Sequence, residues 1–105
     1  MVTDNEAISR TIEDYVNDVK NAMPIDKVFL FGSFAKGSAS THSDIDLCFF
    51  SQSFENQDTF NVVRELFRLS RKYGDFDIEP HVFSSSDLET DNPFVKEVLR
   101  TGIEL

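Results

Sequence analysis

The sequence has few basic side chains, one cysteine, no tryptophan and no long apolar run. Its 10 Lys and Arg residues stand against 19 Asp and Glu residues, a net charge of -9, which argues against binding of polymeric nucleic acid through a broad basic face. Cys48 has no partner for an internal disulfide, and no apolar run approaches the roughly 18 residues that cross a bilayer. Because Met1 to Glu6 also lack the basic and apolar start of a secretory signal, we expect a cytoplasmic protein without membrane contact.

The length fits one compact domain over residues 1–105, because domains commonly contain roughly 100 to 150 residues. Hydrophobic residues make up 40% of the chain and include 11 phenylalanines, each of which removes on the order of 150 to 250 Å² from water when buried. The chain can therefore build one apolar core, and no internal repeat or Pro/Gly-rich linker divides it.

Apolar residues at helical spacing predict three helices, over Asp4–Met23, Phe60–Tyr73 and Phe94–Thr101. Thr3 and Glu6 have the spacing of a capping box at the start of the first helix. The expected stops are Pro24, Gly74 and Gly102, and Asn92 and Pro93 have the residue types of a cap and first helical position.

Short apolar or alternating runs predict three strands, over Lys27–Phe31, Ile45–Phe50 and Phe76–Phe83. Pro80 cannot donate a ladder hydrogen bond, so the third strand is expected at or near a sheet edge. In the second strand Cys48 is expected to pack in the core. The element order indicates an α+β (mixed α/β) domain, with one mixed sheet of three or four strands packed against helices.

The segment between the first two strands carries the residues that suggest chemistry. Gly32 allows a sharp turn and close approach of the backbone to a ligand, and Ser33 adds a hydroxyl where backbone amides can receive an anion. Asp44 and Asp46 are two residues apart, so on a strand their carboxylates share a face about 6 to 7 Å apart along the chain. Such hard oxygen ligands suit Mg²⁺, and two ions can stabilise both oxygens of an in-line phosphoryl displacement.

A third carboxylate would complete this arrangement, as general base or as a ligand of the second ion. We expect Glu79, which lies mid-strand, to supply it, with Asp77 on the same face as the second choice. Lys36 is either a point charge on a phosphate or a surface lysine, and Ser43 either caps the local turn or contacts the ligand.

Two histidines and the phenylalanines receive plainer interpretations. His42 is expected to be an exposed loop residue, and His81, on the same face as Glu79, is expected to be an ordinary strand histidine or a group that supports a metal ligand. The phenylalanine-rich strands are expected to form core, not a platform on which bases stack.

The string GSFAKG followed by SDIDL, with its ten-residue gap between Ser33 and Asp44, resembles the motif of the DNA polymerase β nucleotidyltransferase superfamily, and its minimal nucleotidyltransferase (MNT) branch in particular. The resemblance implies that Gly32 and Ser33 contact a triphosphate, Asp44 and Asp46 bind Mg²⁺, and Glu79 stands at the third acid position. It implies transfer of a nucleoside monophosphate, such as AMP from ATP, to an acceptor hydroxyl. In this family the third position is more often aspartate.

The resemblance also implies a protein partner, because larger similar enzymes carry a further domain that helps bind the acceptor. In minimal members the partner is often a small helical HEPN protein, so an antitoxin that adenylylates its partner is one hypothesis, beside a homo-oligomer. Two alternatives stay open: a weakly active or inactive nucleotide- or partner-binding module, and transfer to a small molecule such as an aminoglycoside.

Overall fold

The computed structural model describes residues 6–39 and 43–105, and this part of the chain forms one mixed sheet with helices on both of its faces. Its helices and strands, in chain order, are α1 (Glu6–Ala22), β1 (Lys27–Phe31), α2 (Ser33–Lys36), β2 (Ile45–Ser51), α3 (Thr59–Ser70), β3 (Ile78–Ser84), α4 (Pro93–Thr101) and β4 (Ile103–Glu104). Short 3₁₀ segments, η1 (Gln52–Asn56), η2 (Arg71–Tyr73) and η3 (Ser85–Glu89), follow β2, α3 and β3. The predicted α+β class is confirmed.

The sheet has the strand order β3-β2-β1-β4. β1 pairs antiparallel with β2 and with β4, whereas β2 and β3 run parallel. Parallel neighbours need a crossover connection, and α3 supplies it between β2 and β3. β3 lies at an edge of the sheet, as Pro80 predicted.

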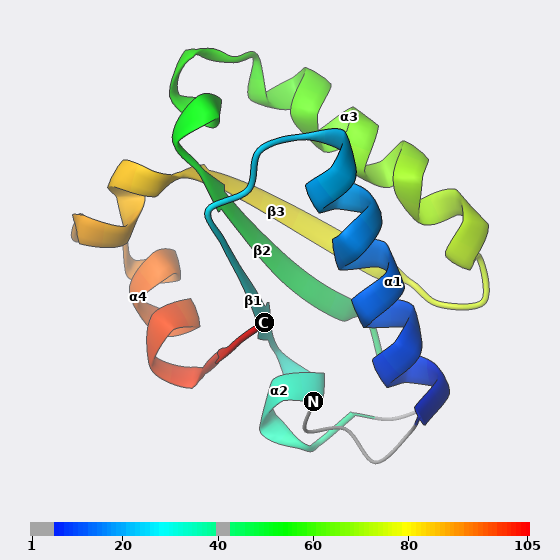
Figure 1. The fold of residues 1–105 in the computed structure, drawn as a ribbon. Helices are drawn as coiled ribbons and strands as arrows, with labels where there is room; N and C mark the ends of the chain where they lie inside the picture. The colour runs from blue at the N-terminus through cyan, green and yellow to red at the C-terminus, as the bar shows by residue number, and fades with distance from the viewer. Residues whose placement is uncertain (1–5, 40–42) are drawn as a thin grey trace.

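Alternate residues of each strand face two different hydrophobic clusters. One face carries Val28, Leu30, Leu47 and Phe49, which pack with the buried sides of α1 and α3. The other face carries Phe29, Cys48 and Phe50, which pack against Val95 and Val98 of α4. Figure 1 shows α4 on the opposite side of the sheet from α1 and α3. The prediction that Cys48 belongs to the core is confirmed, since the residue is fully buried.

Tyr15 ties α1 to α3 and to the sheet. Its ring is fully buried and lies edge-on to the rings of Phe49 and Tyr73, with centroids 6.1 and 6.0 Å away. Its hydroxyl donates a hydrogen bond of 2.8 Å to the backbone carbonyl of Leu66. The polar end of this large side chain is therefore satisfied inside the core, as burial requires.

Three predicted boundaries differ from the structure. The first helix is described from Glu6 to Ala22, and Thr3 of the expected capping box lies outside the described residues. The predicted helix Phe60–Tyr73 divides into α3 and η2. The predicted strand Phe76–Phe83 begins two residues later, at Ile78, because the Phe76 amide bonds to the Tyr73 carbonyl (3.0 Å) and so closes a turn.

The helix stops also differ in mechanism from the sequence prediction. Gly74 has φ of -63° and ψ of -12°, so it is right-handed and does not form the left-handed cap expected of it. Gly102 does end α4, in an extended conformation, where a Cβ would lie 2.5 Å from the Val98 carbonyl oxygen. Asn92 caps α4 as predicted, because its Oδ1 accepts hydrogen bonds from the Phe94 and Val95 amides (2.9 and 3.3 Å). In the described part of the chain, no helix has the length and apolar character needed to span a bilayer.

Candidate active site

The turn after β1 places the backbone of Gly32 against the side chain of Asp46. Gly32 has φ of 76° and ψ of -154°, a conformation that is essentially restricted to glycine. A Cβ at this position would lie 2.3 Å from Asp46 Oδ2 and 3.2 Å from its Cγ. Ser33 follows as the first residue of α2, which ends at Lys36. The Gly-Ser turn and the second aspartate of the motif therefore occupy one place in the fold.

Strand register places Glu79 beside Asp46. In the parallel β2–β3 pair, Asp46 is opposite Glu79, and in the antiparallel β1–β2 pair it is opposite Phe31. Residues directly opposite each other in a ladder share a face of the sheet, so both carboxylates lie on the face that α4 covers. Both are half-buried. The two acids that are far apart in sequence thus become neighbours at the start of two parallel strands.

Asp44 lies just before β2, not on the strand as the sequence predicted, and it is exposed. It still acts on Asp46 electrostatically. The pKa of Asp46 is raised, chiefly because burial disfavours the charged carboxylate, and the negative charges of Asp44 and Glu79 add to the effect. His81 acts in the opposite direction. The three acidic side chains therefore gather enough negative charge around Asp46 to disfavour its ionisation.

A cation would relieve this repulsion, and carboxylate oxygens are the donors that Mg²⁺ prefers. Within residues 6–39 and 43–105, no three His, Cys, Asp or Glu side chains are placed closely enough to hold a metal ion by themselves. Mg²⁺ does not require such a set, because it is commonly bound by one or two carboxylates together with waters and substrate phosphates. The chemistry of the acidic row therefore fits an ion that is shared with a phosphorylated ligand.

The remaining predicted residues surround this row at different distances along the chain. Lys36 is exposed on α2, and its charge reaches α4, where the pKa of Glu97 is lowered first by a hydrogen bond from Arg100 and in smaller part by Lys36. Ser43 is half-buried and precedes Asp44. Asp77 is exposed and precedes β3, and its backbone carbonyl accepts a hydrogen bond from the Ile45 amide (2.7 Å). His42 lies outside the described residues.

Sequence reasoning did not foresee the aromatic contacts beside the acids. The His81 ring lies 5.2 Å from the Phe31 ring and 5.4 Å from the Phe94 ring, measured between centroids. Phe94, at the start of α4, also lies 5.4 Å from Phe31. The i, i+2 relation of Glu79 and His81 was visible in the sequence, but the position of α4 over them was not. These rings fix His81 on the side of the sheet that carries the acidic row.

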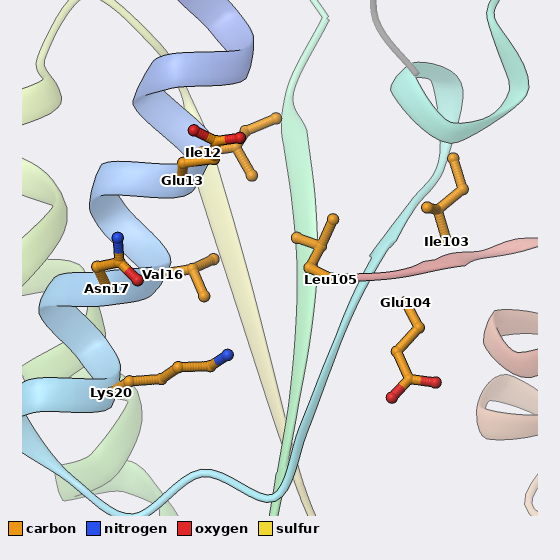
Figure 2. Close-up of a pocket in the computed structure, with 8 residues that line it drawn as sticks. All are labelled: Ile12, Glu13, Val16, Asn17, Lys20, Ile103, Glu104 and Leu105. Carbon is orange, nitrogen blue, oxygen red and sulfur yellow. The ribbon is translucent and has the colours of Figure 1, made fainter. Parts of the chain in front are cut away.

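A second concave region lies elsewhere, between α1 and the segment 103–105 (Figure 2). This groove has a volume of about 500 Å³, and its lining residues are Ile12, Glu13, Val16, Asn17, Lys20, Ile103, Glu104 and Leu105. None of the predicted site residues is among them. The groove has neither a glycine turn nor paired aspartates, so it does not share the chemistry of the site at Gly32 and Asp46.

Comparisons with solved structures show the same fold in proteins of low sequence identity. A provisionally assigned nucleotidyltransferase from Sulfolobus solfataricus superposes with a TM-score of 0.66 at 22% identity, over 99% of this chain and 89% of that one. A toxin–antitoxin structure with AMP-PNP gives 0.65 at 20% identity, over 88% and 70% of the two chains. A mutant of the MntA–HpeT toxin–antitoxin gives 0.63 at 16% identity, over 88% and 69%.

No curated protein matches the chain. The family model described as "Polymerase beta, Nucleotidyltransferase" matches residues 11–105, a range that contains every strand and the whole acidic row. The match agrees with the close approach of the Gly32 turn to Asp46 and with the sheet that brings Glu79 to the same place. This chain therefore belongs to the polymerase β nucleotidyltransferase family.

Proposed function

We propose that this chain transfers a nucleoside monophosphate, AMP from ATP, to an acceptor hydroxyl. The observation that carries the proposal is the contact between the Gly32 backbone and the Asp46 carboxylate, which leaves no room for a side chain at position 32. A turn suited to phosphate and an acid suited to a phosphate-bound cation thereby meet at one point. Family membership supports the same reaction class.

In the proposed reaction, the acceptor oxygen forms a bond to the α-phosphorus of ATP. The bond between that phosphorus and the oxygen bridging to the β-phosphate breaks, and pyrophosphate leaves. Glu79 accepts the proton of the acceptor hydroxyl, as a half-buried carboxylate at the row's outer end can do. The Gly32 backbone and the Ser33 hydroxyl would hold the outer phosphates, with Lys36 as a point charge and Ser43 as a further contact.

Asp44, Asp46 and Glu79 would hold two Mg²⁺ ions between them and the triphosphate. When bound, the ions neutralise phosphate charge and stabilise the attacking and leaving oxygens. The chain's own contribution is to keep three negative groups on one face of the sheet, where their mutual repulsion favours a cation. The Phe31 ring beside Asp46 limits solvent on the β1 side of the row.

The acceptor is proposed to be a protein partner. Two of the solved structures with this fold are toxin–antitoxin structures, one of them with AMP-PNP. The resemblance to minimal nucleotidyltransferases adds a helical HEPN protein as the expected partner, so that this chain would act as the antitoxin. A homo-oligomer is the alternative assembly.

The test is incubation of the chain with ATP labelled at the α-phosphate and with Mg²⁺, alone and with a co-expressed helical partner. Replacing both acids of the pair, Asp44→Asn with Asp46→Asn, should abolish labelling of protein. Glu79→Gln should lower the rate by about 10² to 10⁴-fold, the usual contribution of a general base, whereas Asp77→Asn should retain it. Label that persists in the double variant excludes the proposed site.

A nucleotide-binding module without catalysis is the second candidate. It is favoured by the lack, among the described residues, of three side chains that converge as metal ligands without a substrate. ATP binding without transfer to any acceptor would favour this module. Including an aminoglycoside in the same labelling reaction tests the remaining alternative, a small-molecule acceptor.

A further inference from the structure

The outer edge of β3 is a free sheet edge in the described part of the chain. β3 occupies the end of the strand order and pairs only with β2 among the described strands. Its outward backbone groups are therefore available, except for the missing donor of Pro80. Such an edge is a template for the addition of another strand.

A shallow apolar groove of about 440 Å³ follows this edge. It is lined by Thr59, Phe60 and Val63 at the start of α3 and by residues 80–83 of β3. Phe60 leaves 71% of its surface exposed, and Phe67, two turns further along α3, leaves 41% exposed. Two exposed phenylalanines beside a groove form a larger apolar surface than the scattered single residues usual on soluble proteins.

Positive charge borders this apolar strip in a chain whose net charge is -9. At spacings of three or four residues, one side of α3 and η2 carries Phe60, Arg64, Phe67 and Arg71. Arg68 and Lys72 form ion pairs with Glu65 and Asp18, whereas no ion pair within the described residues involves Arg64 or Arg71. Two uncompensated guanidinium groups therefore stand beside the exposed rings and suit carboxylates from a partner.

The same strand carries the proposed general base. Glu79 precedes Pro80, which lines the groove, and it lies opposite Asp46 in the register. Side chains of an added strand alternate between the two faces of the sheet. One set would therefore meet α3, and the other set would lie on the face of Glu79 and Asp46.

We propose that the β3 edge surface, made of Phe60, Val63, Arg64, Phe67, Arg71 and residues 80–83, docks an extended segment of the protein acceptor. Apolar and acidic side chains of that segment contact α3, and a hydroxyl side chain between them reaches Glu79. A second copy of this chain fits less well, because a symmetric pair would bring like charges of Arg64 and Arg71 together. The transfer step rests on the proposed function, whereas the docking step does not.

The docking is tested with two short strand-forming peptides and ¹⁵N-labelled protein. One peptide has valine, glutamate and a central tyrosine, and the other has lysine in place of glutamate. The acidic peptide should shift the amide signals of residues 59–71 and 78–84, and the lysine peptide should not. Shifts centred on residues 103–105, or equal binding of both peptides, would overturn the proposal, as would no binding of either.

Surface variants provide the matched comparison. Phe60→Ala and Arg64→Glu should each weaken binding of the acidic peptide by about tenfold, the size expected for a residue that anchors an interface. Leu99→Ala and Lys96→Glu are the controls, because both residues are exposed on α4 (Leu99 by 40%) and should change nothing. A dimer in light scattering that Phe60→Ala dissociates would replace the acidic segment by a second copy and overturn the proposal.

Binding of Mg²⁺ with ATP is measured on the same variants in the absence of peptide. If nucleotide binds normally while the peptide does not, the docking proposal alone fails. If the acidic peptide binds at β3 and is never labelled with AMP, the docking proposal stands and the proposed transfer to this segment fails.

Discussion

Replacement of Gly32 by alanine tests the arrangement on which the proposed activity depends. The backbone conformation at this position, φ of 76° and ψ of -154°, disfavours every residue with a Cβ, at a cost of about 1 to 3 kcal/mol. The new methyl group would also lie 2.3 Å from Asp46 Oδ2, so the carboxylate must rotate away. Movement of a catalytic group by about 1 Å can lower a rate by roughly 10²-fold. We therefore expect both lower stability and loss of AMP transfer.

Gly37→Ala is the matched control. Gly37 also has a positive φ, 75°, but no atom lies within 4 Å of the position that its Cβ would occupy. This variant should lose about 1 to 2 kcal/mol of unfolding free energy, the usual penalty of a left-handed alanine, without moving Asp46. Urea unfolding and the labelling assay, run on both variants, separate the two effects. Equal residual activity of the two variants would refute the reasoning that the Gly32 backbone positions the acid.

Three further predictions concern stability and reactivity. Tyr15→Phe should lower the unfolding free energy by about 1 to 3 kcal/mol in urea titrations, because the buried Leu66 carbonyl loses its hydrogen bond; no change would show that the carbonyl finds water. A hydrogen bond from Tyr73 lowers the pKa of Asp18, so this stabilisation is complete above the unfolded value, about 3.9, and is lost as the pH falls through the folded one. Wild type should then lose more stability than Asp18→Asn on acidification, and parallel losses would contradict this. Burial raises the pKa of Cys48 to about 12, so a disulfide reagent such as DTNB should modify this thiol only after denaturation; rapid labelling of native protein would contradict its burial.

Most helices and strands could be predicted because local sequence and tertiary environment agree. The strand Lys27–Phe31 has the predicted bounds, and the cap at Asn92 forms as expected. β4 could not be located from the sequence, because two residues give no usable periodicity and their pairing depends on the packing of Gly102 against the Val98 carbonyl. The turn at Phe76 was mistaken for strand because an apolar residue before a strand fits the alternation equally well.

The candidate site was predictable in its members but not in its surroundings. The spacing of Ser33 and Asp44 indicated the motif, and Glu79 lies in register with Asp46. The roles assigned to these residues stay predictions until the labelling assay is done. Phe94 could not be associated with the site, since its contacts depend on how α4 crosses the sheet. Periodicity describes single elements and carries no information on such a crossing.

The parallel pairing of β2 and β3 decides when during folding the acids meet. Had a hairpin joined these strands, their starts would lie at opposite ends of the sheet, and Glu79 would be remote from Asp46. The crossover through α3 has to close before the two carboxylates are neighbours. Affinity for a divalent cation with nucleotide should therefore appear in one step with tertiary structure, so a refolding chain would gain this affinity together with the burial of Leu66 on α3.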